Sequence, residues 1–262
     1  MSLKLYQVDA FTSKVFGGNP AAVVPLDTWL PDSVMQAIAA ENNLAETAFF
    51  VPETDGYGLR WFTPALEVPL CGHATLASAF VLFTEIAPHL EAIEFHSQSG
   101  TLTVTRKNDL LQMDFPRHRL TRVEAPPALL AGLKTPPAEV YFAEENPNFY
   151  AVYETEAEVR RLSPDFAALL PLGSLGVAVT APGTDCDFVS RYFAPGFGIP
   201  EDPVTGSTHC ALAPYWAGRL SKTDFFARQV STRGGELFCA VADQRVLISG
   251  QAVTYLRGEI KI

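Results

Sequence analysis

The chain has 262 residues, of which 48% are hydrophobic and 18% charged, and its formal net charge is −10. It is long enough to bury a sizeable core, as one large domain or two of ordinary size, and an acidic balance without a Lys/Arg cluster argues against a nucleic-acid partner. No segment approaches the length of a membrane span, and the first residues lack the basic and apolar stretches of a signal peptide, so we expect a cytoplasmic protein. The four cysteines are scattered without CxxC spacing, which predicts neither a disulfide framework nor a structural zinc site.

Strand patterns outnumber helical ones along the chain. Segment 31–43 opens with Pro31 and Asp32 and spaces its apolar residues helically, which predicts an amphipathic surface helix. The proline-rich segment 126–137 is interpreted as a linker between domains of residues 1–125 and 126–262, with the last strand able to pack back on the first domain. Alternation and β-branched or aromatic content predict strands over 4–11, 46–51, 59–64, 101–107, 110–116, 140–143, 149–154, 176–181, 188–195 and 245–250.

Two further segments predict helices with almost no polar surface. The first runs from Gly72 to about Thr84, and a helix that is apolar all round must be buried on every side. Its surroundings recur later: RWFTP at 60–64 is matched by RYFAP at 191–195, and each is followed by a loop, a second proline and a glycine-opened apolar segment. The repeat predicts an α+β fold of two similar domains, each a curled, mostly antiparallel sheet around a central buried helix.

The N-termini of these two helices predict the chemistry of the ligand. A helix N-terminus carries unpaired N–H groups and about half a positive charge, so two converging helices would bind an anion without Lys or Arg. Gly72 and Gly206 would let a ligand approach the backbone closely. If the two domains face one another, both openings lie at their interface, and a small carboxylate-bearing substrate is the expected partner.

Five ordered blocks give the chain a family resemblance. They are VDAFTSKVFGGNPAAVV, NLAETAFF, FTPALEVPLCGHATLA, EDPVTGSTHCAL and QVSTRGGEL, and together they span nearly the whole sequence. The chain resembles the PhzF family, the phenazine-biosynthesis-like isomerases. The resemblance implies a diaminopimelate-epimerase-like fold of two domains related by approximate symmetry, a cofactor-independent isomerase, and a homodimer.

Glu46 is the residue singled out for acid/base chemistry. Strand alternation places it on the same side as Leu44, Ala48 and Phe50, so its carboxyl group lies on an apolar face. Such a setting favours the protonated form, which suits a group that must take up and return one proton. From the residues alone, a structural carboxylate paired with backbone donors or an arginine is equally consistent. The NLAET block of the resemblance implies that Glu46 is the catalytic acid/base.

His73 and Asp202 are the other two candidate catalytic residues. His73 lies in the first turn of the first buried helix, where it could bind a substrate carboxylate, relay a proton or cap its own helix, and the helix dipole would favour its neutral form. Asp202 precedes Pro203 in the loop before the second helix and could equally be a simple Asp-Pro turn. The GHAT and EDPVTGS blocks imply that both residues line the active site.

The remaining candidates are substrate contacts. Ser207 beside Gly206 is either a ligand contact or a helix-terminal hydroxyl. Asn19, in a GGNP turn, is placed at the cleft by the resemblance, and Arg233 before two glycines could pair with a substrate carboxylate or with a glutamate of its own chain. No nucleotide fingerprint, metal-ligand spacing or Schiff-base lysine is found, so neither cofactor nor metal is expected.

Two alternatives compete with a single-carboxylate isomerase. The first is a racemase or epimerase with two thiols, using Cys71, but alignment of the repeat on its glycines places Thr205 opposite Cys71, and a threonine hydroxyl cannot replace a thiolate. Cys210 would lie about one turn deeper in the second helix. The second alternative is a carboxylate-binding protein of the same fold without catalysis.

Overall fold

The computed structural model describes residues 1–262, and the chain divides into two compact units, Met1–Asp114 with Ser249–Ile262 and Phe115–Ile248. The division falls inside strands β8 and β17. The boundary expected at 125/126 therefore lies within the second unit, and the C-terminal strand belongs to the first. Every predicted strand is present, and no helix has the length and hydropathy needed to cross a membrane.

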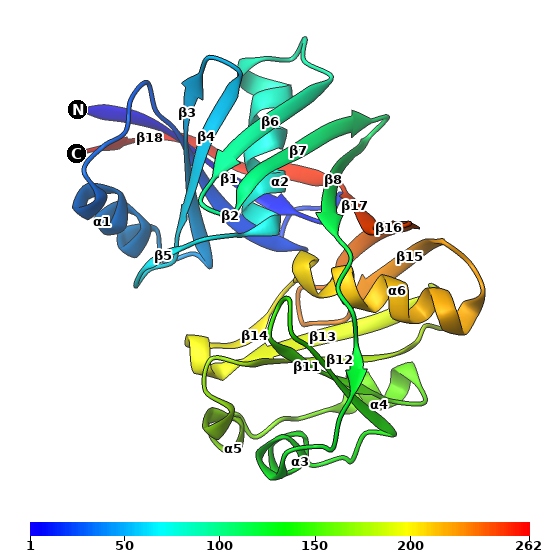
Figure 1. The fold of residues 1–262 in the computed structure, drawn as a ribbon. Helices are drawn as coiled ribbons and strands as arrows, with labels where there is room; N and C mark the ends of the chain where they lie inside the picture. The colour runs from blue at the N-terminus through cyan, green and yellow to red at the C-terminus, as the bar shows by residue number, and fades with distance from the viewer. The chain divides into compact units, whose positions relative to one another are not determined.

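The first unit wraps strands around helix α2 (Figure 1). Eight of the ten residues of α2 are buried, and the helix contacts β1, β2, β3 and β18, which confirms the predicted central helix. Its two hydroxyl residues are compatible with burial because Thr75 donates to the Cys71 carbonyl and Ser78 to that of Ala74, at 2.6 and 2.8 Å. The elements of this unit are β1 (Ser2–Ala10), β2 (Asn19–Pro25), α1 (Asp32–Asn42), β3 (Glu46–Glu53), β4 (Gly56–Phe62), β5 (Glu67–Val68), α2 (Gly72–Val81) with a π-helical turn (Leu82–Ile86), β6 (Ala92–Ser97), β7 (Gly100–Lys107), β8 (Leu110–Pro116) and β18 (Ala252–Lys261).

The second unit repeats this arrangement around α6, whose first six residues are all buried. A 3-10 turn, Gly206–Thr208, leads into this helix, as the sequence predicted from Gly206 onward. The elements are β9 (Thr121–Arg122), α3 (Pro127–Leu133), β10 (Glu139–Ala143), β11 (Asn148–Val152), α4 (Glu156–Arg161), α5 (Phe166–Leu169), β12 (Gly176–Pro182), β13 (Phe188–Ala194), β14 (Ile199–Asp202), α6 (His209–Leu220), β15 (Asp224–Gln229), β16 (Gly235–Ala242) and β17 (Arg245–Gly250), with 3-10 turns at Leu170–Leu172 and Pro195–Phe197.

The interpretation of segment 126–137 as a linker is wrong. Pro127 occupies the first turn of α3, where a missing N–H has no cost, and Leu129 and Leu133 bury one face of this helix in the core of the second unit. The prolines therefore delimit a packed helix. They do not mark a flexible connection.

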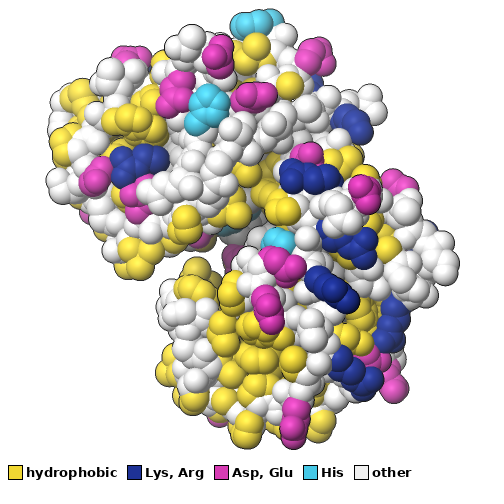
Figure 2. Space-filling model, in the orientation of Figure 1, with side chains coloured by type: hydrophobic (Ala, Val, Ile, Leu, Met, Phe, Trp, Pro, Cys, Tyr) yellow, Lys and Arg dark blue, Asp and Glu magenta, His cyan; other side chains and the backbone are white.

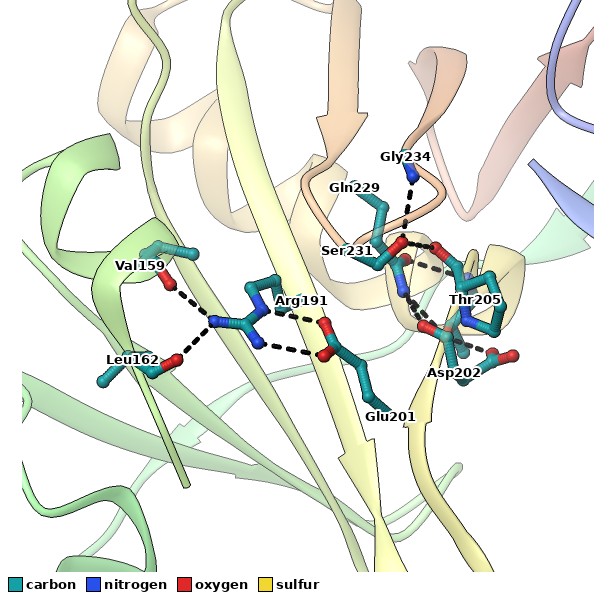
Figure 3. A network of polar contacts seen from close by, with 10 residues as sticks. Val159, Leu162, Arg191, Glu201, Asp202, Thr205, Gln229, Ser231 and Gly234 are labelled. Carbon is teal, nitrogen blue, oxygen red and sulfur yellow. Dashed lines mark hydrogen bonds and ion pairs between the residues drawn. The ribbon is translucent and has the colours of Figure 1, made fainter. Parts of the chain in front are cut away.

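The predicted internal repeat extends to strand register. In both copies a parallel pair of strands is followed by two antiparallel partners and then by the central helix. Two bidentate ion pairs recur at the same place: Arg60 binds Glu67 across β4 and β5, and Arg191 binds Glu201 across β13 and β14. Arg191 also donates to two main-chain carbonyls (Figure 3). Each ion pair joins two neighbouring strands and so fixes the short second strand, which precedes the glycine at the start of the central helix.

Acidic and basic side chains are both spread over the molecular surface shown in Figure 2. A surface pocket of about 360 Å³ lies at the end of the β3–β4 hairpin, and its lining includes Glu53, Asp55, Tyr57 and Glu94. Glu46 and Glu53 stand at opposite ends of β3, roughly 23 Å apart along an extended strand. This pocket is therefore separate from the candidate site in the same unit.

Candidate active site

Strand β3 and helix α2 bring Glu46 and His73 together. Glu46 is the first residue of β3 and His73 the second residue of α2, and their side chains are 12% and 6% exposed. The Nε2 atom of His73 lies 3.1 Å from the Glu46 carboxylate. Two candidate residues from separate segments of the sequence are thus direct neighbours in a largely water-excluded position.

The other ring nitrogen of His73 has two polar neighbours. The Asn19 side-chain amide nitrogen lies 3.1 Å from Nδ1, and the Cys71 sulfur lies 3.5 Å from the same atom. Asn19 is the first residue of β2, which runs parallel to β3, and it is fully buried. Both nitrogens of the imidazole therefore have polar neighbours within 3.5 Å, but the contact between Nε2 and the Glu46 carboxylate does not have hydrogen-bond geometry.

These contacts change the protonation of both His73 and Cys71. Burial alone would lower the pKa of His73, but the Cys71 sulfur and the Glu46 carboxylate, with their hydrogen bonds, hold that pKa well above its ordinary value. Burial, followed by the charge of Glu46, raises the pKa of the Cys71 thiol to about 11. Because the thiol is then neutral at physiological pH, Glu46 is the partner that favours a proton on His73. The expectation that the helix dipole keeps His73 neutral is wrong, since a carboxylate at 3.1 Å outweighs half a charge at the helix end.

The same three residues offer one possible metal ligand each, and these atoms lie within 4.8 Å of one another. However, Glu46 faces Nε2 of His73, whereas Cys71 faces Nδ1. A metal bound through either nitrogen would have only one of the two other ligands on its side of the ring. The geometry suits proton transfer within the cluster better than a shared ion.

Gly72 lies between Cys71 and His73 and borders open space. A Cβ atom built at Gly72 would meet no atom within 4 Å. The space on the Cβ side of Gly72 is therefore open, as the sequence analysis required of a glycine that lets a ligand approach the backbone.

Asp202 is the predicted residue of the second unit that takes part in a polar network there (Figure 3). Thr205 donates to the Asp202 carboxylate at 2.5 Å, and the Gln229 side chain donates to the Asp202 carbonyl at 2.8 Å while accepting from the Thr205 N–H at 2.8 Å. The loop before Gly206 is thereby held from both sides. Asp202 is half-buried and is thus a fixed carboxylate next to a helix opening.

Ser207 and Arg233 are both half-buried. Ser207 is in the 3-10 turn that begins at Gly206, and no side-chain cap bond forms there. The turn that contains Arg233 is attached to the loop, because Ser231 donates to the Pro203 carbonyl and accepts from the Gly234 N–H, at 2.8 and 3.1 Å.

Sequence analysis missed Tyr192. When the two copies are aligned by strand register, Gly176 in the second copy is equivalent to Glu46 in the first. Tyr192 is likewise equivalent to Trp61, since Tyr192 pairs with Asp202 and Trp61 pairs with Val68. A Cβ at Gly176 would lie 2.0 Å from the Tyr192 hydroxyl oxygen, so the phenol fills the space of a side chain there. The hydroxyl donates to the Asn148 side-chain oxygen at 2.8 Å.

The repeat therefore holds a carboxylate at this position in one copy only. Two sequence signals could have revealed this. A second Asn-Pro pair at 146–147 matches the pair at 19–20, and an aromatic residue follows the equivalent arginine in each copy. Both become interpretable only when the strand register is known.

The fold defines the class: a two-unit α+β protein like the solved PhzF-family structures, with the same general fold as a probable proline racemase. Residues 8–258 match the family described as phenazine biosynthesis-like protein (PhzC-PhzF), and the chain belongs to that family. A relative from Pseudomonas aeruginosa, named only as an uncharacterized isomerase, is 50% identical over 262 residues, covering all of both chains. The chain is accordingly an enzyme of the isomerase class.

Solved structures agree with this assignment. The crystal structure of a PhzF-family protein from Enterococcus faecalis is similar with a TM-score of 0.96 and 49% identity over all of both chains. A hydroxyproline epimerase from Agrobacterium vitis has a TM-score of 0.61 at 11% identity, covering 99% of this chain and 92% of the other. The second likeness is one of fold alone, and it places the predicted α+β architecture within a wider group of epimerase-like structures.

Proposed function

We propose that the protein moves a proton within a small carboxylate-bearing substrate, with Glu46 as the general acid/base and without an organic cofactor. The observation that carries this proposal is the buried contact between Glu46 and His73, 3.1 Å apart at the N-terminus of α2. The substrate hydrogen would pass to the Glu46 carboxylate as a proton and return to another atom of the same molecule, so that atoms and charge balance.

The surroundings suit each part of this reaction. The open space at Gly72 allows a substrate carboxylate or a developing enolate to reach the N–H groups of α2, which favour negative charge. His73 can donate a proton from Nε2 toward the same region. Burial of the pair excludes water that would otherwise capture the proton in transit.

Asp202, Gly206, Ser207 and Arg233 are proposed to complete the site from the second unit. Their support is the fixed loop around Asp202 and the family resemblance. That they meet Glu46 in one cleft, and that the enzyme works as a homodimer, stay predictions.

The two-thiol alternative has one observation in its favour, the contact between Cys71 and His73. Three others oppose it. The thiol pKa of about 11 leaves little thiolate at neutral pH. Thr205 takes the place of Cys71 in the second copy, and Cys210, where burial raises the pKa of the thiol to about 12, lies inside α6.

The test is isomerisation in deuterated solvent with a panel of cyclic and amino-acid carboxylates, read by mass spectrometry and NMR. Glu46→Gln keeps the shape of the side chain but removes the base, so turnover and deuterium incorporation are expected to fall by a factor of about 10² or more while binding persists. Cys71→Ala is the matched control and should retain turnover. An inactive Cys71→Ala beside an active Glu46→Gln would establish the thiol mechanism, and binding without any exchange in the parent protein would indicate a binding protein.

A further inference from the structure

Strand β18 forms an open edge of the sheet in the first unit. It pairs with β1 along its full length, and Leu5 and Tyr6 of β1 are buried, at 8% and 7% exposure. Their partners in β18, Gly258 and Arg257, are exposed, as is every residue from 255 to 259. The cover over the sheet therefore ends at β18, and an exposed edge strand offers its main-chain groups to another chain.

The two chain ends show which main-chain groups of β18 are directed outward. Met1 and Ile262 exchange both of their hydrogen bonds. The register is regular from this end to residue 256, and in such an antiparallel pair the exchange recurs at every second residue. Residues 260, 258 and 256 therefore also direct their N–H and C=O groups toward β1. Arg257 and Glu259 lie between them and direct theirs away from β1.

The charges of this edge favour one pairing with a second copy. Hydrogen bonds across a new antiparallel pair join residues whose groups face outward, so a two-fold axis passes through the position of one β18 residue. An axis at Arg257 or at Glu259 places that charge opposite its own copy, which is unfavourable. An axis at Gly258 places Arg257 opposite Glu259 of the partner subunit twice. An axis at Ile260 also joins opposite charges, but the chain end limits the overlap to residues 258–262.

We propose that two copies of the chain pair along β18, antiparallel about a two-fold axis at Gly258. The resemblance implies a homodimer but not its interface, and the surface assigned here is independent of the reaction proposed for Glu46. Arg257 and Glu259 of each subunit exchange main-chain hydrogen bonds with the residues opposite them. Because both subunits use the same edge, the pairing closes at two chains.

Both charged side chains keep groups available for a partner. Arg257 donates to Glu85 through Nε and Nη2, at 3.0 and 2.5 Å, so the N–H groups of Nη1 are not used in that ion pair. The Glu259 carboxylate accepts from the Ser2 hydroxyl at 2.8 Å through one oxygen, which leaves the other. The Arg257 side chain is 61% exposed, so it can reach a neighbouring strand.

Exposed apolar side chains lie along the same edge. Tyr255 and Leu256 are 49% and 40% exposed within β18, and the Phe16 ring contacts that of Tyr255 at a centroid distance of 5.7 Å. Met1 and Ile262 are exposed at the end of the strand pair. Pairing of two edges would cover part of this apolar surface, which adds a hydrophobic contribution to the hydrogen bonds and ion pairs.

Exchange of the two charges tests the proposal. Arg257→Glu and Glu259→Arg each place like charges opposite one another twice, so the dimer Kd from sedimentation velocity should rise by about a hundredfold or more. An equimolar mixture of the two variants places two acidic residues opposite two basic ones, and it should associate as the parent protein does. The double variant Arg257→Glu/Glu259→Arg should also dimerise.

Two controls separate the edge from other effects. Glu85→Gln breaks the ion pair that Arg257 makes within its own chain, and it should leave the dimer intact. Arg228→Glu makes the same change of charge in an ion pair with Glu236, which belongs to the second unit, and it should also leave the dimer intact.

A disulfide at the axis tests the register. Gly258→Cys would face its own copy across a non-hydrogen-bonded pair, with Cα atoms about 4.5 Å apart, which suits a disulfide. Space is available, since the nearest atom to a Cβ there is Cδ2 of Leu256 at 3.4 Å. Under mild oxidation this variant, unlike the parent protein, should migrate at twice the chain mass on a non-reducing gel. Ile260→Cys is the matched control, because the two copies of this residue would lie about 13 Å apart along the strands.

A parent protein with the mass of one chain would overturn the proposal, whatever the variants do. So would single charge variants that dimerise as the parent does, or a cross-link in Ile260→Cys in place of Gly258→Cys. The cross-link does not depend on either charge variant folding. None of these measurements uses turnover, so an active Glu46→Gln would overturn the proposed function and leave the interface standing, and a monomeric parent would do the reverse.

Discussion

Individual residues in this protein owe their acid/base behaviour to neighbours from distant parts of the chain. His73 is held between Asn19, 54 residues away, and Glu46, and a carboxylate offsets the cost of burying the imidazolium. His209, at the start of the equivalent helix in the second unit, has no such partner. Its Nδ1 atom lies 3.0 Å from the Thr205 carbonyl, its ring stacks on Phe188, and burial lowers its pKa to about 4.

The opposite shifts of these two histidines predict opposite pH dependence of stability. For His73, whose folded pKa is raised, the contribution to stability is complete below the ordinary pKa of about 6.5 and is lost as pH rises through the folded value. For His209 the unfolded chain binds a proton between about pH 6.5 and 4 that the folded chain does not, so stability falls as the solution is acidified through that window.

The His209 effect can be measured with His209→Asn, whose amide can replace the Nδ1–H donor. In the parent protein His209 is expected to cost about 3 kcal/mol of unfolding free energy between pH 6.5 and 4. The variant should lose that part of the slope, read from denaturant midpoints across the pH range, although the smaller side chain lowers stability throughout. Equal slopes in the two proteins would contradict the assignment of a neutral, buried His209.

The identity of the candidate site residues could be predicted from the sequence to a useful extent, and their pairing could not. Strand alternation and the opening of an apolar helix drew attention to Glu46, Gly72 and His73, and the family resemblance gave Glu46 and His73 their predicted roles. The contact between Asn19 and His73 depends on β2 lying parallel to β3 and under α2, and no local pattern encodes that placement. The direction of the His73 shift was missed for the same reason, because it depends on the carboxylate contact and not on the helix end.

At the scale of secondary structure, sequence analysis succeeded where one pattern dominated. The two central helices were predicted from their lack of polar surface, and the alternating segments all form strands. Segments 19–25, 92–97, 224–229, 235–242 and 252–261 form strands that were not predicted. Pro20 follows the first residue of segment 19–25, and charged residues interrupt segment 252–261. The helix within 126–137 was missed because prolines at both ends concealed a short apolar face.

The two copies of the repeat differ at the position of Glu46. Both copies share the arginine–glutamate ion pair, but Gly176 stands at the position that Glu46 has in the first copy, and the Tyr192 side chain fills the space beside it. The second copy contributes a different carboxylate, Asp202, from the next strand along. A reaction with a single Glu46 base is consistent with this asymmetry.

Gly176→Ala tests the packing between Gly176 and Tyr192. The added methyl group would meet the phenol at 2.0 to 2.5 Å, so we expect a loss of about 1 to 3 kcal/mol in unfolding free energy. Gly72→Ala is the control, since its Cβ would meet no atom within 4 Å and should change stability little. Combining Gly176→Ala with Tyr192→Ala removes the clash, so the double variant should lose less than the sum of the single losses. Strict additivity in this cycle would show that the two positions do not interact.

At the scale of the whole molecule, the two ends of the chain belong to the same unit. The second unit is a continuous segment, Phe115–Ile248, whereas the first is assembled from Met1–Asp114 and Ser249–Ile262. Strand β18 lies antiparallel to β1 along its full length, from Ser2 opposite Lys261 to Ala10 opposite Ala252. The first unit, with Glu46 and His73, can therefore be completed only after the second has been synthesised.

This dependence predicts unequal effects of truncation. Removal of residues after Gly250 would expose the hydrogen-bonding edge of β1 and uncover its buried residues, so the first unit should lose its protection against hydrogen exchange. The second unit retains all its strands and should stay protected, as read by mass spectrometry of peptides from each unit.

The control is a circular permutant in which a short flexible linker joins Ile262 to Met1, with new ends between the exposed residues Gly173 and Ser174. Since the Ile262 N–H already donates to the Met1 carbonyl at 2.9 Å, the permutant should keep β18 in place and protect both units. Full protection of residues 1–114 in the truncated chain would show that β18 is dispensable, and the unit would then be complete without its C-terminal strand.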